Sequence, residues 1–340
     1  MAAHDEQIKA LLDEVGPRAN RDVLRDILRT AVGLAGDDVD RLDLKITAAA
    51  LKEMRAAFAM FRPLVDHPKV TIFGSARTHT DDPLYQQAKR LAHELAERGW
   101  MVITGAGPGI MAAGAEGAGP DRAIGISIRL PFEEATEVAL SEGGHNVAMK
   151  YFFTRKLMLM KESSAFVSLP GGFGTQDETL ELCTLLQTGK AIPAPLVLLD
   201  VPGGTYWTRW VEYVEHELVR GGLVSPEDHE LYLVTGDVDV AVAEIERFWR
   251  NYHSIRWVSD LLVVRLRHQP TPAEVATLDE SFRDLLVDGH LAATAPLPAE
   301  VADQDRLDLP RLVMRYDPRR AGRLRALIDA VNLLPSANPE

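Results

Sequence analysis

The chain has very little cysteine, with Cys183 the single one among 340 residues. One cysteine excludes an intramolecular disulfide bond and a zinc site built on cysteine ligands. The ten histidines are scattered without the H-x-x-H or H-E-x-x-H spacing of metal ligands. The sequence therefore predicts a protein without a metal site, in which Cys183 is a small buried hydrophobic residue.

Long apolar runs are also lacking, since none approaches the roughly 18–20 residues of a membrane span. The first residues, Met-Ala-Ala-His-Asp-Glu-Gln, lack the basic and then apolar pattern of a signal peptide. Basic residues are outnumbered, and the formal net charge of −13 argues against nucleic acid as a partner. We expect a soluble cytoplasmic protein that binds neither membranes nor nucleic acid.

Two common nucleotide-binding motifs are absent. A G-x-G-x-x-G fingerprint that includes Gly105 and Gly107 would need glycine at position 110, where the chain has Ile110. No G-x-x-x-x-G-K-[S/T] sequence occurs, which disfavours a P-loop kinase or NTPase. A small phosphate can still bind where positive charge gathers locally. One stretch gathers four basic residues: Lys150, Arg155, Lys156 and Lys161.

The order of apolar segments predicts an α/β fold. From Lys69 to Trp249, continuous apolar strands alternate with helices, a pattern typical of a doubly wound parallel sheet with both faces covered. We predict a helical N-terminal extension over 1–66, the α/β domain over 67–252 and a small α+β module over 253–340.

The predicted C-terminal module has the order β-α-β-β-α, with one strand over 257–266. It contains no phosphate turn and no metal-spaced cluster, so we expect a role in interaction or regulation. Within the α/β domain, His145 and Asn146 follow two glycines and are predicted to lie in a loop.

Three glycine-rich turns, 74–76, 105–109 and 170–174, each follow a predicted strand. Ligands of parallel sheets bind beyond the carboxyl ends of the strands, so we expect the turns to converge. The third turn opens a helix, whose N–H groups and partial positive charge suit a phosphate. The candidate substrate-binding residues in these turns are Gly74, Ser75, Gly105, Gly107, Gly109, Gly171, Gly172, Gly174 and Thr175.

Glu178 is the candidate catalytic carboxylate, because it lies in the first helical turn beside the expected phosphate site. Thr175 and Glu178 also have the T-x-x-E spacing of a capping box, in which Glu178 would only satisfy a backbone N–H. Caps do not require three glycines, whereas close approach of the backbone to a ligand does. We therefore place catalysis first and capping second.

Arg155 is the candidate partner of Glu178. On a helix it shares a face with Phe152 and Leu159, and an arginine half-buried there needs an anion to offset its desolvation. Glu178 or a ligand phosphate could supply that anion, while a structural ion pair or a snorkelling surface arginine is the alternative. Lys156 points about 100° away on the same helix and is a weaker candidate.

A family resemblance follows from these motifs. Phe153-Thr154-Arg155-Lys156, the strand over 165–169 and P-G-G-F-G-T-x-x-E occur in the order and spacing of the LOG (LONELY GUY) family, whose members are often mislabelled lysine decarboxylases. The chain resembles this family over about residues 69–250, the first two turns included. The resemblance implies a Rossmann-like domain and a phosphoribohydrolase, which splits a nucleoside 5′-monophosphate into free base and ribose 5-phosphate.

The resemblance also implies residue roles. Arg155 and Glu178 would be catalytic, and Lys156 would hold substrate together with the 171–175 turn. Glu133 matches, less securely, an acidic residue that the family has after the third strand. AMP or N6-prenylated AMP is the implied substrate, as in cytokinin activation, and a homodimer without a cofactor is expected. The helical N-terminus and the module after residue 254 depart from compact plant-type members.

The expected chemistry suits the residues. Breaking a ribosyl C–N bond builds positive charge on the sugar, which a carboxylate at C1′ can stabilise while it activates the attacking water. Two other functions stay open at this point. One is a non-catalytic nucleotide-binding or sensing protein with the C-terminal module as its output, and the other is a carrier of a phosphorylated cofactor.

Overall fold

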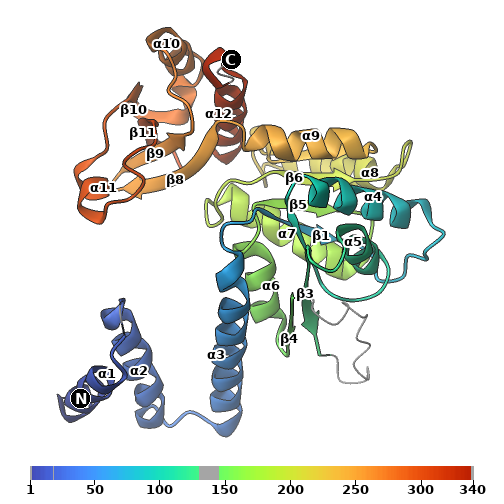
Figure 1. Cartoon of the computed structure of the whole chain (residues 1–340). Helices are drawn as coiled ribbons and strands as arrows, with labels where there is room; N and C mark the ends of the chain where they lie inside the picture. The colour runs from blue at the N-terminus through green and yellow to red at the C-terminus, as the bar shows by residue number, and fades with distance from the viewer. Residues whose placement is uncertain (1, 18, 130–144, 338–340) are drawn as a thin grey trace. The chain divides into compact units, whose positions relative to one another are not determined.

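The computed structural model of the chain describes residues 2–17, 19–129 and 145–337. The chain divides into two compact units, Met1–Ala56 and Ala57–Glu340. The first unit is helical, with α1 (Ala2–Val15), α2 (Arg21–Gly36) and most of α3 (Arg41–Phe61), as Figure 1 shows in blue. The expected helical N-terminal extension is thereby confirmed.

The second unit is built on a parallel sheet. In its described part, seven strands lie in the order β4-β3-β2-β1-β5-β6-β7, and every neighbouring pair is parallel. The strands are β1 (Lys69–Phe73), β2 (Met101–Thr104), β3 (Ala123–Ile128), β4 (His145–Met149), β5 (Ala165–Ser168), β6 (Leu196–Leu199) and β7 (Tyr232–Thr235). This arrangement confirms the predicted doubly wound, Rossmann-like α/β class.

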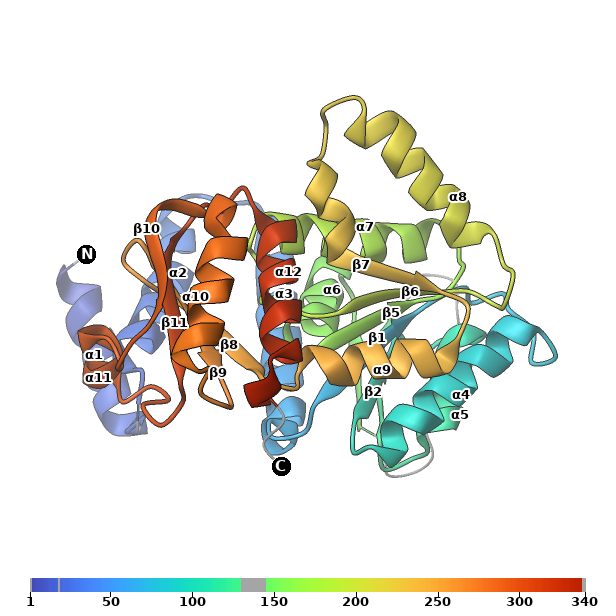
Figure 2. The ribbon, with the colours of Figure 1, turned by 90° about the horizontal axis from the view of Figure 1, so that it is seen from above.

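Helices cover both faces of the sheet (Figure 2). One face carries α4 (Pro83–Glu97), α5 (Ile110–Ala118) and α9 (Val238–Phe248), and the other carries α6 (Phe152–Lys161), α7 (Phe173–Gln187) and α8 (Tyr206–Tyr213). Strand β1 is buried throughout, so its residues alternate between two cores. Val70 and Ile72 pack in the cluster with α4, α5 and α9, while the Thr71 hydroxyl donates to the Leu159 carbonyl of α6 at 2.9 Å.

The sheet topology decides where a ligand can bind. The chain runs outward from β1 through β2, β3 and β4, and then returns to place β5 on the other side of β1. Strands β2, β1 and β5 are thus neighbours, with Val70 paired to both Val102 and Ala165. The three glycine-rich turns leave these adjacent strands at the edge where such sheets bind ligands.

Two local expectations were wrong. Strand β4 stands where a loop was expected at His145 and Asn146; it is an edge strand with only Val147 and Met149 buried, so no continuous apolar run marks it. In the C-terminal module, β8 (Tyr252–Val258) and β9 (Leu261–Leu266) form a hairpin where one strand was predicted. The turn between them contains neither glycine nor proline, and Ser259 adopts a φ of 55° instead.

The C-terminal module has its own antiparallel sheet, in the order β10-β11-β9-β8. Its further elements are α10 (Pro272–Ser281), β10 (Leu286–Ala293), α11 (Pro298–Asp303), β11 (Arg311–Tyr316) and α12 (Ala321–Leu333). The Asn332 side chain accepts from the Asn251 and Tyr252 N–H groups, both at 2.8 Å, and donates to the Phe248 carbonyl at 2.6 Å. This amide fastens α12 to the end of α9.

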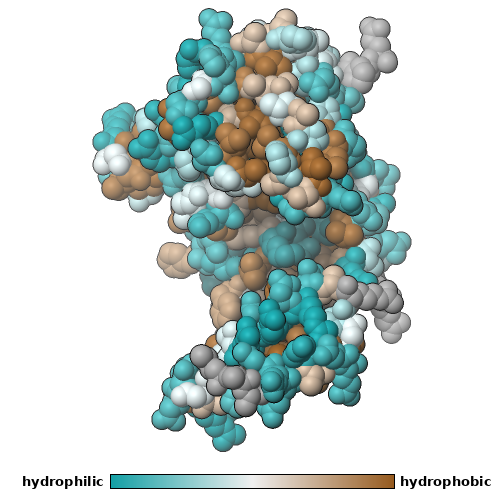
Figure 3. Space-filling view, turned by 90° about the vertical axis from the view of Figure 1, so that its left-hand side faces the viewer, coloured by the Kyte–Doolittle hydropathy of each residue, from teal (hydrophilic) through white to brown (hydrophobic). Residues whose placement is uncertain are grey.

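Some large apolar side chains of this module remain exposed, namely Trp257, Val287, Val301 and Leu307. Figure 3 shows apolar residues gathered on the upper part of the visible face, at the height of the module. The described helices include none that is both long and apolar enough to cross a bilayer. The predicted domain boundaries at residues 66 and 252 stay predictions.

Close packing of α4 on α5 yields a stability prediction. A Cβ added at Gly117 would lie 2.1 Å from the Lys89 carbonyl oxygen of α4, a backbone atom that can move only with its helix. We expect Gly117→Ala to lower the free energy of unfolding by about 1–3 kcal/mol, measured by denaturant titration. Gly174→Ala in α7 is the control, because its Cβ would meet no atom within 4 Å. Equal stability of the two variants would contradict this packing.

Candidate active site

The structure brings the three glycine-rich turns into contact. The Ile110 N–H at the start of α5 donates to the Ser75 carbonyl at 3.0 Å. Gly109 has a φ of 67°, and a Cβ there would lie 2.3 Å from the same carbonyl oxygen. A Cβ on Gly171 would lie 3.0 Å from the Ser75 nitrogen and 2.2 Å from the Thr175 hydroxyl. The turns after β1, β2 and β5 therefore form one continuous backbone surface.

The remaining glycines of the turns fall into two groups. In the first group, an added Cβ would clash with a neighbouring side chain. The clash is with Ile110 at Gly74, with Arg155 at Gly105 and with Met111 at Gly107. By contrast, a Cβ on Gly172 or Gly174 would meet no protein atom within 4 Å. Packing does not require glycine at these two positions, which lie at the open N-terminus of α7.

Helix α7 begins two residues before Thr175. Its first residue is Phe173 and its N-cap is Gly172, which makes no side-chain capping hydrogen bond. Thr175 is thus the third residue of the helix, so the capping-box interpretation of Thr175 and Glu178 is wrong. The first N–H groups of a helix have no partners within it and carry partial positive charge, which makes this end a site for an anion.

Arg155 is held from three sides. Its Nε donates to the Ile126 carbonyl at 2.9 Å, and its Nη2 donates to the Gly105 carbonyl at 3.2 Å. Its Nη1 lies 3.8 Å from Oε1 of Glu178. The residue is only 8% exposed, which excludes a snorkelling surface arginine. Helix α6 thereby places a fixed guanidinium between the end of β2 and the middle of β3, facing Glu178.

Glu178 has an unusual acidity for a carboxylic acid. Burial raises its pKa to about 7, although the neighbouring positive charge of Arg155 acts in the opposite direction. Burial also lowers the pKa of Arg155, against the effect of Glu178. A carboxyl group that titrates near neutrality, beside an anion site, is suited to proton transfer at physiological pH.

Lys156 lies in an ion-pair cluster between α6 and α7. Its Nζ is 2.9 Å from Oδ2 of Asp177, and it also pairs with Glu181. Burial lowers the pKa of Lys156, but the hydrogen bonds to Glu181 and Asp177 outweigh this effect and raise it. The predicted substrate-holding lysine thus ties the two helices that carry Arg155 and Glu178. Glu133 lies outside the described residues.

Sequence reasoning missed Tyr206 and Asp200, two polar residues that support the third turn. The Tyr206 hydroxyl donates to the Gly171 carbonyl at 2.5 Å and accepts from Nε2 of Gln176 at 2.6 Å. The Tyr206 N–H in turn donates to Oδ2 of Asp200, the residue directly after β6, at 3.0 Å. No sequence pattern predicts the hydrogen bond between Tyr206 and Gly171, because Tyr206 follows β6 whereas the turn follows β5.

Comparison with known proteins shows which family the chain resembles. Residues 108–245 match the family described as "Possible lysine decarboxylase". The cytokinin riboside 5′-monophosphate phosphoribohydrolase LOG3 of Arabidopsis thaliana is 33% identical over 94 residues, which cover 28% of this chain and 42% of LOG3. LOG7 of the same plant is 27% identical over 179 residues, covering 51% and 79%. Over the sheet domain the chain is therefore similar to the LOG family.

The match to LOG-family relatives is partial in length. The probable phosphoribohydrolase LOGL5 of Oryza sativa subsp. japonica is 28% identical over 167 residues, covering 47% of this chain and 64% of LOGL5. The chain therefore spans less than two thirds of LOG3 and of LOGL5. In the residues that the structure describes, no group of three His, Cys, Asp or Glu side chains could hold a metal ion.

Solved structures resemble the fold more distantly. The molybdenum cofactor binding protein from Rippkaea orientalis is 16% identical with a TM-score of 0.38, covering 53% of this chain and 96% of that protein. The molybdenum cofactor carrier protein from Chlamydomonas reinhardtii is 21% identical with a TM-score of 0.37, covering 53% and 97%. Likeness at this level carries no argument about function.

The raised pKa of Glu178 predicts how stability depends on pH. Between pH 4.5 and about 7 the folded chain keeps a proton that the unfolded chain has lost, so stability falls across this range and is level above it. Glu178→Gln replaces the titrating carboxyl group, so it removes this fall in stability with rising pH. We expect its free energy of unfolding to match wild type near pH 4 and to exceed it by about 1–3 kcal/mol at pH 8.

The control for this experiment is Glu116→Gln. The hydrogen bond from Tyr85 is the main cause that holds the pKa of Glu116 below its usual value. This carboxylate therefore stabilises the fold above pH 4.5, and its replacement should destabilise at pH 8, opposite in sign to Glu178→Gln. Denaturant titrations at both pH values measure the difference. A Glu178→Gln variant that is less stable than wild type at pH 8 would contradict a buried, costly carboxylate.

Proposed function

We propose that the chain is a nucleoside 5′-monophosphate phosphoribohydrolase, which splits AMP or N6-modified AMP into free base and ribose 5-phosphate. The observation that carries this proposal is the pair of buried Arg155 and largely buried Glu178 beside the N-terminus of α7. The names of the LOG-family relatives support the same reaction class. The continuous surface of the three turns supports a phosphate as the anchored group.

In the proposed reaction, the phosphate binds at the N-terminus of α7 and thereby places the ribose toward Glu178. As the bond between C1′ and the base nitrogen breaks, its electron pair leaves with the base, which takes up a proton from solvent, and positive charge grows on the sugar. The Glu178 carboxylate stabilises that charge and takes a proton from the water whose oxygen bonds to C1′. Anchoring the phosphate supplies several kcal/mol by fixing this geometry.

Arg155 acts through Glu178 in this proposal. Its guanidinium favours the ionised carboxylate, which burial alone would disfavour. Because two backbone carbonyls also hold the guanidinium, its position does not depend on substrate. The pair is therefore preorganised before the nucleotide binds.

We also propose a cytoplasmic homodimer that needs no cofactor, membrane or nucleic acid. Phe152 and Phe153 at the start of α6 are 56% and 55% exposed, and Phe173 at the start of α7 is 97% exposed. Large apolar side chains left this exposed favour burial against another protein surface. A second copy of the chain is the partner expected from the family.

Release of ribose 5-phosphate from AMP tests the proposed reaction. Wild type should release it together with adenine, and Glu178→Gln should lower kcat by about 10²–10⁴-fold, since the general base is lost. AMP affinity, measured by calorimetry, should change little. Glu116→Gln is the matched control, with activity close to wild type. If AMP binds but neither it nor any other nucleoside monophosphate is hydrolysed, the chain is a non-catalytic nucleotide-binding protein.

Tyr206→Phe tests the support of the phosphate turn. This variant loses a hydrogen bond to the Gly171 carbonyl, worth about 1 kcal/mol. We expect KM for AMP to rise about fivefold while kcat stays within about twofold, because Glu178 and Arg155 are untouched. Tyr213→Phe, at the exposed end of α8, is the control. A fall in kcat at constant KM would place the Tyr206 hydroxyl in the chemical step instead.

A further inference from the structure

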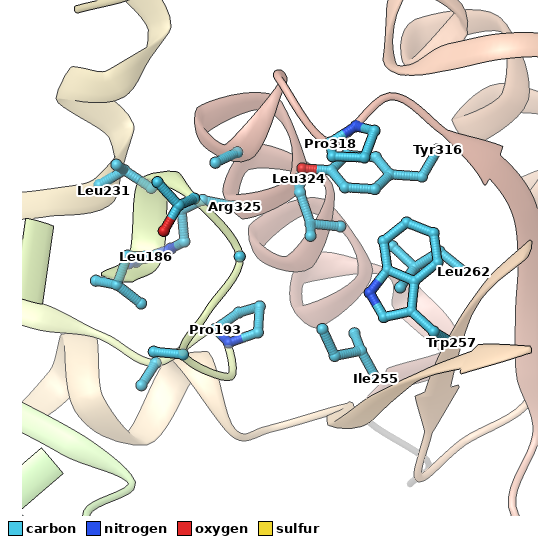
Figure 4. A pocket seen from close by; sticks show the side chains of 15 residues that line it. Leu186, Pro193, Leu231, Ile255, Trp257, Leu262, Tyr316, Pro318, Leu324 and Arg325 are labelled. Carbon is cyan, nitrogen blue, oxygen red and sulfur yellow. The ribbon is translucent and has the colours of Figure 1, made fainter. Parts of the chain in front are cut away.

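A cavity of about 130 Å³ lies where the C-terminal module meets the end of α7 (Figure 4). One side comes from the last turn of α7 and the loop that follows it, and the other comes from β8, β9, β11 and the start of α12. Apolar and aromatic side chains dominate the lining: Leu186, Pro193, Ile255, Trp257, Tyr316 and Leu324.

Two aromatic rings form one corner of this cavity. The ring centroids of Trp257 and Tyr316 lie 5.9 Å apart, with the planes tilted by 44°. Tyr316 is buried, whereas Trp257 is 44% exposed although its neighbours in the lining are apolar. An indole left half in water beside an apolar space gains from contact with a flat ring, because aromatic pairs add to the energy of area burial.

Arg325 and Thr188, two polar residues of the lining, already have partners within the protein. Arg325 forms an ion pair with Glu244 of α9, and its Nε donates to Oδ2 of Asp329 at 3.1 Å. The Thr188 hydroxyl donates to the Thr184 carbonyl at 2.7 Å. The charge of Arg325 is balanced by its acidic partners, and Thr188 carries no charge. The lining therefore favours a neutral ligand.

We propose that this cavity binds a small, neutral, planar aromatic molecule of one or two rings. Its volume fits that class, since an apolar cavity of about 150 Å³ in another protein stays dry and binds benzene. The site is separate from the candidate active site but contacts the same helix. Leu186 lies near the end of α7, whose first turns carry Thr175 and Glu178.

Titration of the full chain with indole tests this site without any assay of catalysis. We expect a saturable heat of binding in isothermal titration calorimetry and a rise in melting temperature measured by circular dichroism, since a ligand that binds only the folded state stabilises it. Trp257→Phe keeps an aromatic wall, so it should keep both effects.

Two variants that fill the cavity provide the structural control. Ala321→Phe places a ring inside it, and Thr188→Tyr covers its rim from an exposed position. Each should weaken indole binding by about tenfold or more, because binding must displace the new side chain. Thr208→Tyr, on an exposed part of α8, should bind like wild type. Absence of saturable binding, or binding unaffected by both filling variants, would overturn the proposal.

Discussion

The guanidinium of Arg155 is the group on which the geometry of the candidate site depends. It donates to the carbonyl of Gly105 directly after β2 and to that of Ile126 within β3, and it faces the carboxylate of Glu178 on α7. Arginine suits this position because its planar fork offers several donors at once and it stays charged when buried. The absence of a side chain at Gly105 is part of the same arrangement, since a Cβ there would lie 2.0 Å from Nη2 of Arg155.

Burial of Glu178 shows why such a site is not optimised for stability. A carboxylate held away from water, with its nearest cation 3.8 Å distant, is not fully compensated, and burial raises its pKa to about 7. The same environment makes it a better base near neutrality than an exposed glutamate would be. The environment that would favour the proposed reaction therefore lowers the stability of the fold, a trade-off common for functional residues.

Much of this site can be predicted from the sequence because it is carried by local patterns. Strand, glycine turn and helix follow one another at β1, β2 and β5, and parallel topology then brings the turns together without further information. The pairing of Arg155 with Glu178 was also predicted, since both lie on elements that flank the same turn.

Other features depend on contacts between distant segments, which a local pattern does not encode. Tyr206 supports Gly171 from 35 residues away, and its role exists only once β5 and β6 are paired. The T-x-x-E spacing fitted a capping box, but the helix starts at Phe173 because the backbone geometry of the turn decides its beginning. Edge strand β4 escaped detection because one of its faces is not buried.

The C-terminal module is an integral part of the second unit, because buried charges span its junction with the sheet domain. Glu244 on α9 is 6% exposed and pairs with Arg325 on α12, which is also 6% exposed. Removing one member of such a pair leaves an uncompensated buried charge, which typically costs 3–5 kcal/mol, roughly the scale of a whole domain's stability margin. A chain cut near residue 252 would also lose the Asn332 amide from the end of α9. Since α7 and the module line one cavity, a ligand bound there would contact both the module and the helix that carries Glu178.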